Sequence, residues 1–157
     1  MEIIEYDQKY QEQIIDLILH IQNEEAKINL SLAEQPDLLD IFKSYYQQGG
    51  HFYLAVDKGE VVGTIAFMNY GNHNAVLKKF FVKKDWRSKK VGLALYQHLL
   101  RKLKAERYQQ VLLDTPAVAK ASHRFYERAG FKRIEKQAIP FNYVFAERDS
   151  YLYLLEL

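Results

Sequence analysis

The sequence predicts an α/β (α+β) fold: one mixed, largely antiparallel, twisted sheet flanked by helices on both faces. Strand-like and helix-like patterns follow one another in the order β-α-α-β-β-β-α-β-α-β-β along the 157 residues. Hydrophobic residues make up 48% and charged residues 27% of the chain, as in an ordinary soluble globular protein. We therefore expect a single domain over residues 1–157.

Each element follows from the spacing of apolar residues and from the turn residues between them. Strands are expected over 2–6, 51–57, 60–70, 75–82, 109–115, 131–134 and 151–157, and helices over 7–21, 36–47, 87–107 and 117–129. Lys58-Gly59 and Gly71-Asn72 indicate turns between strands, and Gly130 ends the last helix. The strand–helix–strand unit over 75–115 should form a right-handed parallel crossover.

Charge balance and the lack of cysteine exclude several classes of protein. Twenty-two Lys and Arg against 20 Asp and Glu leave a net charge of +2, too balanced for a dedicated nucleic-acid binder. A chain without cysteine has no disulfide, no thiolate metal site and no cysteine nucleophile. The sequence has neither a membrane-spanning apolar run nor a signal-peptide core. We therefore expect a cytoplasmic protein without a metal, a nucleic-acid partner or a membrane partner.

The most informative segment is the strand–loop–helix junction over 77–100. Basic residues occupy five of the eight positions 83–90. A helix N-terminus carries unpaired N–H groups and a partial positive charge, so basic residues there are unfavourable unless an anionic ligand binds. Gly92 falls in the first turn, where a missing Cβ would let a phosphate approach the backbone. The alternative is a solvated basic surface, with Gly92 retained for helix packing.

These residues resemble the acyl-CoA-binding motif of the GNAT superfamily of N-acetyltransferases. The motif is Arg/Gln-x-x-Gly-x-Gly/Ala, and this sequence has Arg87-Ser88-Lys89-Lys90-Val91-Gly92, with Lys90 in place of the first glycine. A second family signature follows as FYERAGFKRI over 125–134. The resemblance covers 75–135 and implies a GNAT-like fold in which the two central parallel strands splay apart.

The resemblance implies acetyl-CoA as co-substrate, with no metal, and it indicates which residues would hold it. The pyrophosphate would rest on loop N–H groups, and the pantetheine arm would pair with the preceding strand as an added strand does. The residues implied in binding are Phe80, Phe81, Val82, Arg87, Ser88, Lys89, Lys90, Val91, Gly92, Leu93 and Tyr126. Ala119 stands where the family often has an asparagine, so one contact to the cofactor is expected to be missing.

Acetyl transfer to an amine needs a base for the ammonium and a proton donor for the leaving thiolate. Tyr126 lies where the family places this general acid, and a tyrosine is protonated at neutral pH. Asp114 ends the strand over 109–115, where family members often have the general base. The alternatives are a packing tyrosine and a strand-end aspartate that caps a turn. His73 is a second candidate base.

The resemblance therefore predicts an acetyl-CoA-dependent N-acetyltransferase acting on a primary amine of a small molecule, a polyamine or a peptide. Glu24, Glu25 and Glu34 favour a cationic acceptor, and the segment 136–150 is expected to line its cleft. The alternatives are a non-catalytic acyl-CoA sensor and a nucleic-acid-binding module built on the basic, aromatic run over 78–90. The strand over 151–157 could pair with a second copy at a sheet edge and form a homodimer.

Overall fold

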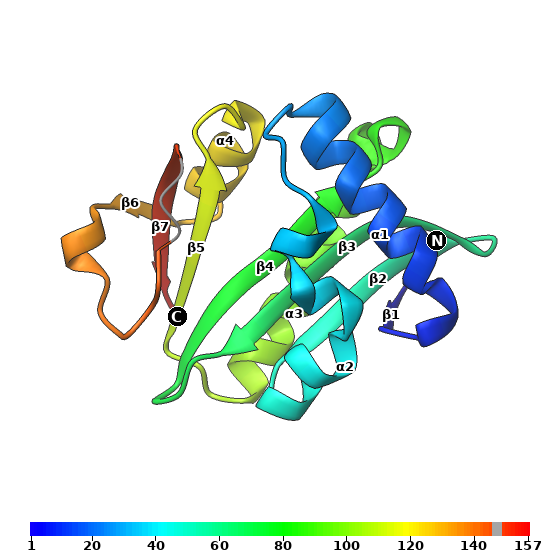
Figure 1. Cartoon of the computed structure of the whole chain (residues 1–157). Helices are drawn as coiled ribbons and strands as arrows, with labels where there is room; N and C mark the ends of the chain where they lie inside the picture. Colours follow the sequence, from blue (N-terminus) through cyan, green and yellow to red (C-terminus); the bar gives the residue numbers. More distant parts are fainter. Residues whose placement is uncertain (146–148) are drawn as a thin grey trace.

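A computed structural model describes residues 1–145 and 149–157 of the chain. Its centre is a seven-stranded sheet in the order β1-β2-β3-β4-β5-β7-β6 (Figure 1). The strands are β1 Glu2–Glu5, β2 His51–Asp57, β3 Glu60–Asn69, β4 Asn74–Val82, β5 Gln110–Pro116, β6 Lys132–Ile134 and β7 Ser150–Glu156. Neighbouring strands run antiparallel, except for β4 and β5, which run parallel. The predicted mixed, largely antiparallel sheet is confirmed.

Helices cover both faces of the sheet, as the sequence predicts (Figure 1). They are α1 Gln11–Leu19, α2 Ile41–Ser44, α3 Val91–Ala105 and α4 Lys120–Arg128. Leu95 of α3 and Tyr126 of α4 belong to the apolar core on one face, whereas Ile14 of α1 and Ile41 of α2 belong to the core on the other. Among the described residues no helix is both long and apolar enough to span a bilayer.

The two N-terminal helices are more divided than the sequence predicts. The helix expected over 36–47 is split into three short helical turns, because the Asp40 backbone leaves the helical region at φ −148° and ψ 72°. The Asp40 side chain accepts a hydrogen bond from the Lys43 N–H and caps α2 instead. The helix expected over 7–21 starts with a 3₁₀ turn and ends in a π-helical turn, His20–Glu25.

The parallel strands β4 and β5 pair at one end only. Asn74, Ala75 and Val76 of β4 pair with the first three residues of β5, and no described pairing continues toward Val82. On its other side β5 pairs with β7 along its whole length. The two strands are therefore joined at one end of the sheet and separated at the other (Figure 1). We call this separation the split, and it confirms the predicted splaying of the central parallel strands.

A β-bulge reorients the half of β4 that borders the split. The register between β3 and β4 shifts near Thr64, and Lys79 has a left-handed backbone with φ +52°. The Thr64 hydroxyl donates to the Lys79 carbonyl oxygen at 2.7 Å and fixes this bulge. The extra residue changes the alternation, so Phe80 packs toward α3 and α4 while Phe81 packs toward α1 and α2.

Strand β7 lies inside the sheet and not at its edge. It pairs with β5 on one side, and its residues Leu152–Leu154 pair with β6 on the other. The expectation that the strand over 151–157 is a free edge for a second copy is therefore wrong. Strand β6 of the same chain already pairs with that edge of β7.

Candidate active site

The residues expected to bind the cofactor gather at the open end of the split. The free half of β4 carries Phe80, Phe81 and Val82. The 3₁₀ helix Lys84–Lys89 carries Arg87, Ser88 and Lys89. The next residue, Lys90, is the N-cap of α3, and the first turn of α3 consists of Val91, Gly92 and Leu93. The helix thus starts at Val91, later than the expected residue 87. Its first N–H groups have no carbonyl partner one turn earlier in the helix, so they can bind an anion.

Lys90 has the left-handed backbone that glycine adopts most easily. Its dihedral angles are φ 60° and ψ 23°. This conformation costs a residue with a Cβ about 1 kcal/mol or more of free energy, whereas glycine adopts it without that cost. The acyl-CoA-binding motif has glycine at this position, so the lysine makes the turn from 3₁₀ helix to α3 at an energetic cost.

Gly92 has room beside it for a larger residue. A Cβ at this position would lie 3.6 Å from Phe80 Cζ and 3.6 Å from Val82 Cγ2, which is ordinary van der Waals contact. Glycine costs about 1 kcal/mol relative to alanine inside a helix. Packing within the chain therefore does not require glycine here, and the open space faces the free half of β4.

The loop is tied by an ion pair to the π-helical turn His20–Glu25, which follows α1. Arg87 Nη2 donates to Glu25 Oε1 at 2.5 Å, and Arg87 Nε donates to the Val82 carbonyl oxygen at 2.9 Å. Lys89 Nζ lies 4.5 Å from the centroid of the Trp86 ring. Glu25, which was expected to favour a cationic acceptor, thus joins the π-helical turn to the basic loop.

Tyr126 of α4 is buried beside the split on the α3 and α4 side. Its side chain is 6% exposed, and its ring lies 6.2 Å from that of Phe80 and 5.6 Å from that of Phe131. Burial raises the pKa of the Tyr126 phenol well above its usual value, and the charges of Asp114 and Tyr96 raise it further. The phenol therefore keeps its proton at neutral pH, as a proton donor must.

Asp114 lies on the opposite face of β5, toward α1 and α2. It is two residues beyond Leu112, the last β5 residue paired with β4, and it stands opposite Leu152 in the β5–β7 ladder. The Tyr143 hydroxyl donates to Asp114 Oδ2. The expected acid and base thus flank the split from two sides, close enough for the Asp114 charge to raise the pKa of Tyr126.

One aromatic residue near Asp114, Tyr70, was not predicted to line the site. The Tyr70 ring lies 5.6 Å from that of Tyr143 and 5.9 Å from that of Phe141. Tyr70 follows β3 in the turn that leads to the joined end of β4, whereas the other two precede β7, so these rings come from opposite sides of the β4–β5 pair. Phe141 and Tyr143 belong to the segment 136–150, which was expected to line the acceptor cleft, but nothing in the sequence pattern pairs this segment with Tyr70.

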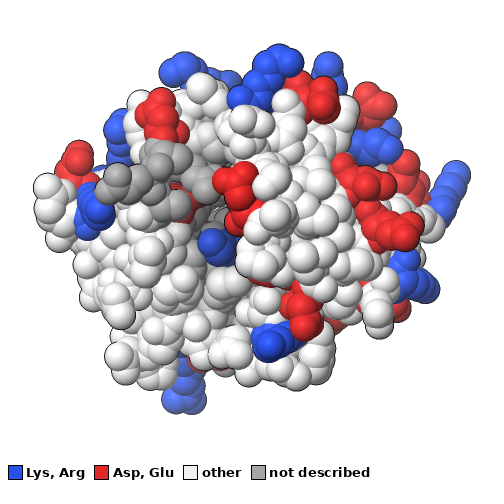
Figure 2. Space-filling view, viewed as in Figure 1, with Lys and Arg blue, Asp and Glu red and all other residues white. Residues whose placement is uncertain are grey.

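The same face carries an ion pair at the β4 bulge. Lys79 Nζ lies 2.7 Å from Gln35 Oε1 and 3.7 Å from Asp37 Oδ2, and its side chain is 12% exposed. The Tyr45 hydroxyl donates to the same Asp37 oxygen at 2.6 Å. Figure 2 shows that this face is hollowed near its middle and that basic and acidic side chains meet there.

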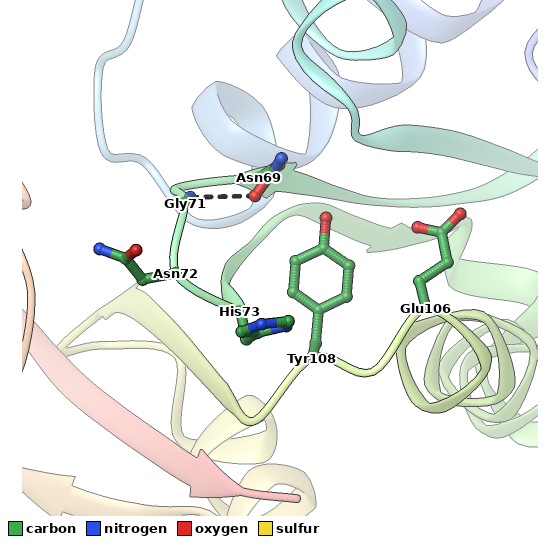
Figure 3. A pocket seen from close by; sticks show the side chains of 6 residues that line it. All are labelled: Asn69, Gly71, Asn72, His73, Glu106 and Tyr108. Carbon is green, nitrogen blue, oxygen red and sulfur yellow. Dashed lines mark hydrogen bonds between the residues drawn. The ribbon is translucent and has the colours of Figure 1, made fainter.

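His73 lies at the other end of the sheet. It belongs to the left-handed turn between β3 and β4, and its carbonyl oxygen accepts from the Gln109 N–H at 2.7 Å, where β4 and β5 are joined. It lines a pocket of about 380 Å³ together with Asn69, Gly71, Asn72, Glu106 and Tyr108 (Figure 3). His73 therefore lies at the joined end of β4 and β5, away from the free half of β4.

Comparison with known proteins identifies the family. The model of the Acetyltransferase (GNAT) family matches residues 15–131. This chain belongs to the GNAT family of acetyltransferases, whose enzymes use acetyl-CoA. The predicted family, fold and enzyme class are confirmed, and the nucleic-acid-binding alternative is not supported.

Two solved structures and one curated relative illustrate the likeness. An acetyltransferase of Streptococcus agalactiae is 37% identical, with a TM-score of 0.96 over 99% of this chain and 98% of that chain. The PaiA N-acetyltransferase of Thermoplasma acidophilum in complex with coenzyme A shares the fold, at 16% identity and a TM-score of 0.78 over 99% and 98% of the two chains. The N-acetylaspartate synthetase of Xenopus tropicalis is 34% identical over 108 residues, which are 68% of this chain and 40% of that protein. This chain spans less than half the length of such curated relatives.

Proposed function

We propose that this protein transfers the acetyl group of acetyl-CoA to a primary amine by direct attack of the amine on the thioester. The split between β4 and β5 carries the proposal. The β4 edge beyond Val76 has no described strand partner on the β5 side. An extended, amide-containing chain such as pantetheine can pair with that edge as an added strand does.

The loop at the end of the split fits the anionic end of coenzyme A. The first-turn N–H groups of α3 and the basic residues Arg87, Lys89 and Lys90 supply donors and positive charge. Space beside Gly92 and the left-handed turn at Lys90 support a phosphate position on the backbone at 87–93.

Tyr126 and Asp114 are the groups that we propose to move protons. Asp114 takes a proton from the ammonium, directly or through water, and leaves a neutral amine with a free lone pair. The amine nitrogen then bonds to the acetyl carbon and releases its second proton to solvent as the carbon–sulfur bond breaks. Tyr126 gives its proton to the sulfur and regains one from solvent, so the products are an N-acetyl amine and the coenzyme thiol.

The acceptor belongs to one of a few amine classes. A small-molecule amine, a polyamine and a peptide N-terminus or lysine all suit an N-acetyltransferase. The name of the Xenopus relative, N-acetylaspartate synthetase, is a reason to add free amino acids to that set.

An amine panel with detection of thiol release tests the proposal. At least one amine should release coenzyme thiol faster than buffer alone and should yield its N-acetyl product by mass spectrometry. In the Asp114→Asn variant the rate should fall most at low pH, where the amine is protonated, and least near the amine's own pKa. A protein that acetyl-CoA stabilises against heat but that acetylates no amine would support the sensor alternative instead.

A further inference from the structure

Arg87 has an acidic partner in the loop that is proposed to hold the phosphates. Its Nη2 donates to Glu25 Oε1 at 2.5 Å, and its Nε donates to the Val82 carbonyl oxygen at 2.9 Å. A guanidinium has five N–H donors, so these two bonds leave three for another acceptor. The carboxylate nonetheless offsets the positive charge of the guanidinium. An anionic ligand at this loop therefore meets a pair of opposite charges and not a single cation.

The π-helical turn holds Glu25 in its place. The Ala26 N–H donates to the Ile21 carbonyl oxygen, five residues earlier, at 2.9 Å. In the same turn the Gln22 side chain is 5% exposed, and its amide exchanges two hydrogen bonds with the Gln35 amide at 2.8 and 2.9 Å. A buried network of this kind fixes the groups that it joins. The backbone that carries Glu25 is therefore anchored only three residues away.

The Arg87 side chain, by contrast, lies closer to the surface. It is 44% exposed, against 24% for Glu25. An ion pair at this level of exposure contributes little to stability, so a change of partner costs little free energy. A phosphate group offers the planar guanidinium two parallel hydrogen bonds, as a carboxylate does. Arg87 is therefore the member of the pair that can change partner while Glu25 stays in place.

We propose that Arg87 exchanges Glu25 for a phosphate group of coenzyme A when the cofactor binds, and returns to Glu25 when the coenzyme leaves. This inference rests on the proposed function, which places the phosphates on the backbone at 87–93. Glu25 is a positioning residue, because it holds the guanidinium until the phosphates arrive and competes with them afterwards. It therefore weakens the binding of coenzyme A and speeds its release.

Isothermal titration calorimetry with coenzyme A tests the exchange through a double-mutant cycle. Glu25→Gln keeps the size of the side chain and removes its charge, so it should lower the dissociation constant about threefold to fivefold, as expected for the loss of an exposed ion pair. In an Arg87→Gln background the same substitution should change the dissociation constant less than about twofold, because no guanidinium has to leave Glu25. Stopped-flow measurement should show that Glu25→Gln also slows the release of coenzyme A by about threefold to fivefold.

The ion pair between Lys83 and Glu60 is the matched control. It joins the residue before the 3₁₀ helix to the first residue of β3, with Lys83 Nζ 2.7 Å from Glu60 Oε2. Lys83 is not one of the residues proposed to bind the phosphates, so Glu60→Gln should leave the dissociation constant within about twofold of the native value. Equal effects of Glu25→Gln and Glu60→Gln, or equal effects of Glu25→Gln in the two backgrounds, would overturn the exchange, because loop charge would then act only at a distance.

The same measurements separate this inference from the proposed function. If coenzyme A binds with the expected differences between variants but no amine in the panel is acetylated, the exchange stands and the proposed function fails. If the native chain does not bind coenzyme A, the phosphate position fails and the exchange fails with it.

Discussion

At the scale of single residues, Tyr126 and Asp114 lie on opposite faces of the sheet, and the negative charge of Asp114 raises the pKa of the Tyr126 phenol. The phenol belongs to the apolar core under α3 and α4, while the carboxylate lies on the other face with Tyr143. A thioester held in the split would have one of these groups on each side.

Replacing Tyr126 by phenylalanine removes the proposed donor and keeps the ring. The turnover number should fall by roughly 10²–10⁴, the usual contribution of a positioned acid. The KM for acetyl-CoA and the melting temperature should change little, because the ring contacts with Phe80 and Phe131 remain. Steady-state kinetics with an acceptor from the panel measure this, and a native rate would remove Tyr126 from the mechanism.

Tyr96 of α3 has a buried hydroxyl without a hydrogen-bond partner among the described residues. Its ring packs against Phe125 at 5.6 Å and against Phe131 at 6.3 Å. An unsatisfied buried hydroxyl costs about 1–3 kcal/mol, so Tyr96→Phe should leave the free energy of unfolding unchanged or raise it. Urea unfolding measures this free energy.

Tyr153→Phe is the matched control for that substitution. The Tyr153 hydroxyl donates to Glu127 Oε2 at 2.7 Å, so its removal should lower the free energy of unfolding by about 1 kcal/mol. A larger loss in Tyr96→Phe than in Tyr153→Phe would show that the Tyr96 hydroxyl does have a partner in solution.

At the scale of elements, turn chemistry and alternation were sufficient to predict the strands. The strand over 51–57 has the predicted ends, and Lys58 and Gly59 both adopt the left-handed backbone of a tight hairpin. The prediction of one continuous helix over 36–47 was wrong, because the Asp40 side chain accepts a hydrogen bond from the Lys43 N–H and starts a new helical turn. No local pattern marks the bulge at Lys79, which depends on a bond from β3.

The residues of the candidate site also fall into those that local sequence patterns predict and those that depend on tertiary contacts. The basic loop and Tyr126 lie in continuous motifs, so the sequence alone could indicate them. The cluster of Asp114, Tyr70 and Tyr143 joins three segments that meet only after the sheet has formed. Side chains brought together by tertiary contacts leave no periodic signal, so the sequence indicated Asp114 and the segment that holds Tyr143 but not Tyr70 or the contact between them.

Gly92 allows a test of the α3 N-terminus as an anion site. Gly92→Ala should fold normally, because its Cβ would lie at ordinary contact distance from Phe80 and Val82. Gly92→Asp should also fold but should abolish the rise in melting temperature that millimolar acetyl-CoA causes in the native chain. It places a negative charge where the phosphate groups are proposed to bind. An unchanged shift in Gly92→Asp would contradict this position for the phosphates.

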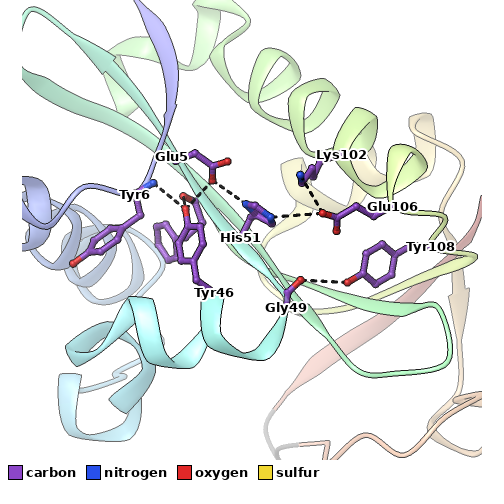
Figure 4. Close-up of polar contacts among 9 residues, drawn as sticks. Glu5, Tyr6, Tyr46, Gly49, His51, Lys102, Glu106 and Tyr108 are labelled. Atoms are coloured by element: carbon purple, nitrogen blue, oxygen red, sulfur yellow. Dashed lines mark hydrogen bonds and ion pairs between the residues drawn. The ribbon is translucent and has the colours of Figure 1, made fainter.

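At the scale of the whole molecule, the two ends of the sheet are built differently. At the end away from the split, His51 Nδ1 lies 3.0 Å from Glu5 Oε1 and His51 Nε2 lies 3.8 Å from Glu106 Oε1 (Figure 4). Lys102 Nζ lies 3.0 Å from the same Glu106 oxygen, and the Tyr46 hydroxyl donates to Glu5. These contacts join β1, β2 and α3, so polar bonds fix this end of the sheet, while β4 and β5 have no described pairing at the other end.

The aromatic interior predicts that the fold fails in alkali. Nine of the 12 tyrosines have a phenol pKa raised above its usual value, chiefly because burial disfavours the phenolate. They are Tyr6, Tyr45, Tyr46, Tyr53, Tyr70, Tyr96, Tyr108, Tyr126 and Tyr153. A phenol that holds its proton more tightly when folded stabilises the protein fully below the unfolded pKa of about 10.

Above about pH 10 the unfolded chain loses phenol protons that the folded chain retains, so stability falls as pH rises. Each phenol that stays protonated only in the folded state lowers the free energy of unfolding by about 1.4 kcal/mol per pH unit in this range. We expect the ultraviolet absorbance of tyrosinate to rise steeply and together with the loss of far-ultraviolet circular dichroism, because most phenols ionise only when the chain unfolds. Titration of most tyrosines near their ordinary pKa, with the circular dichroism of the fold intact, would show that these phenols are open to water in solution.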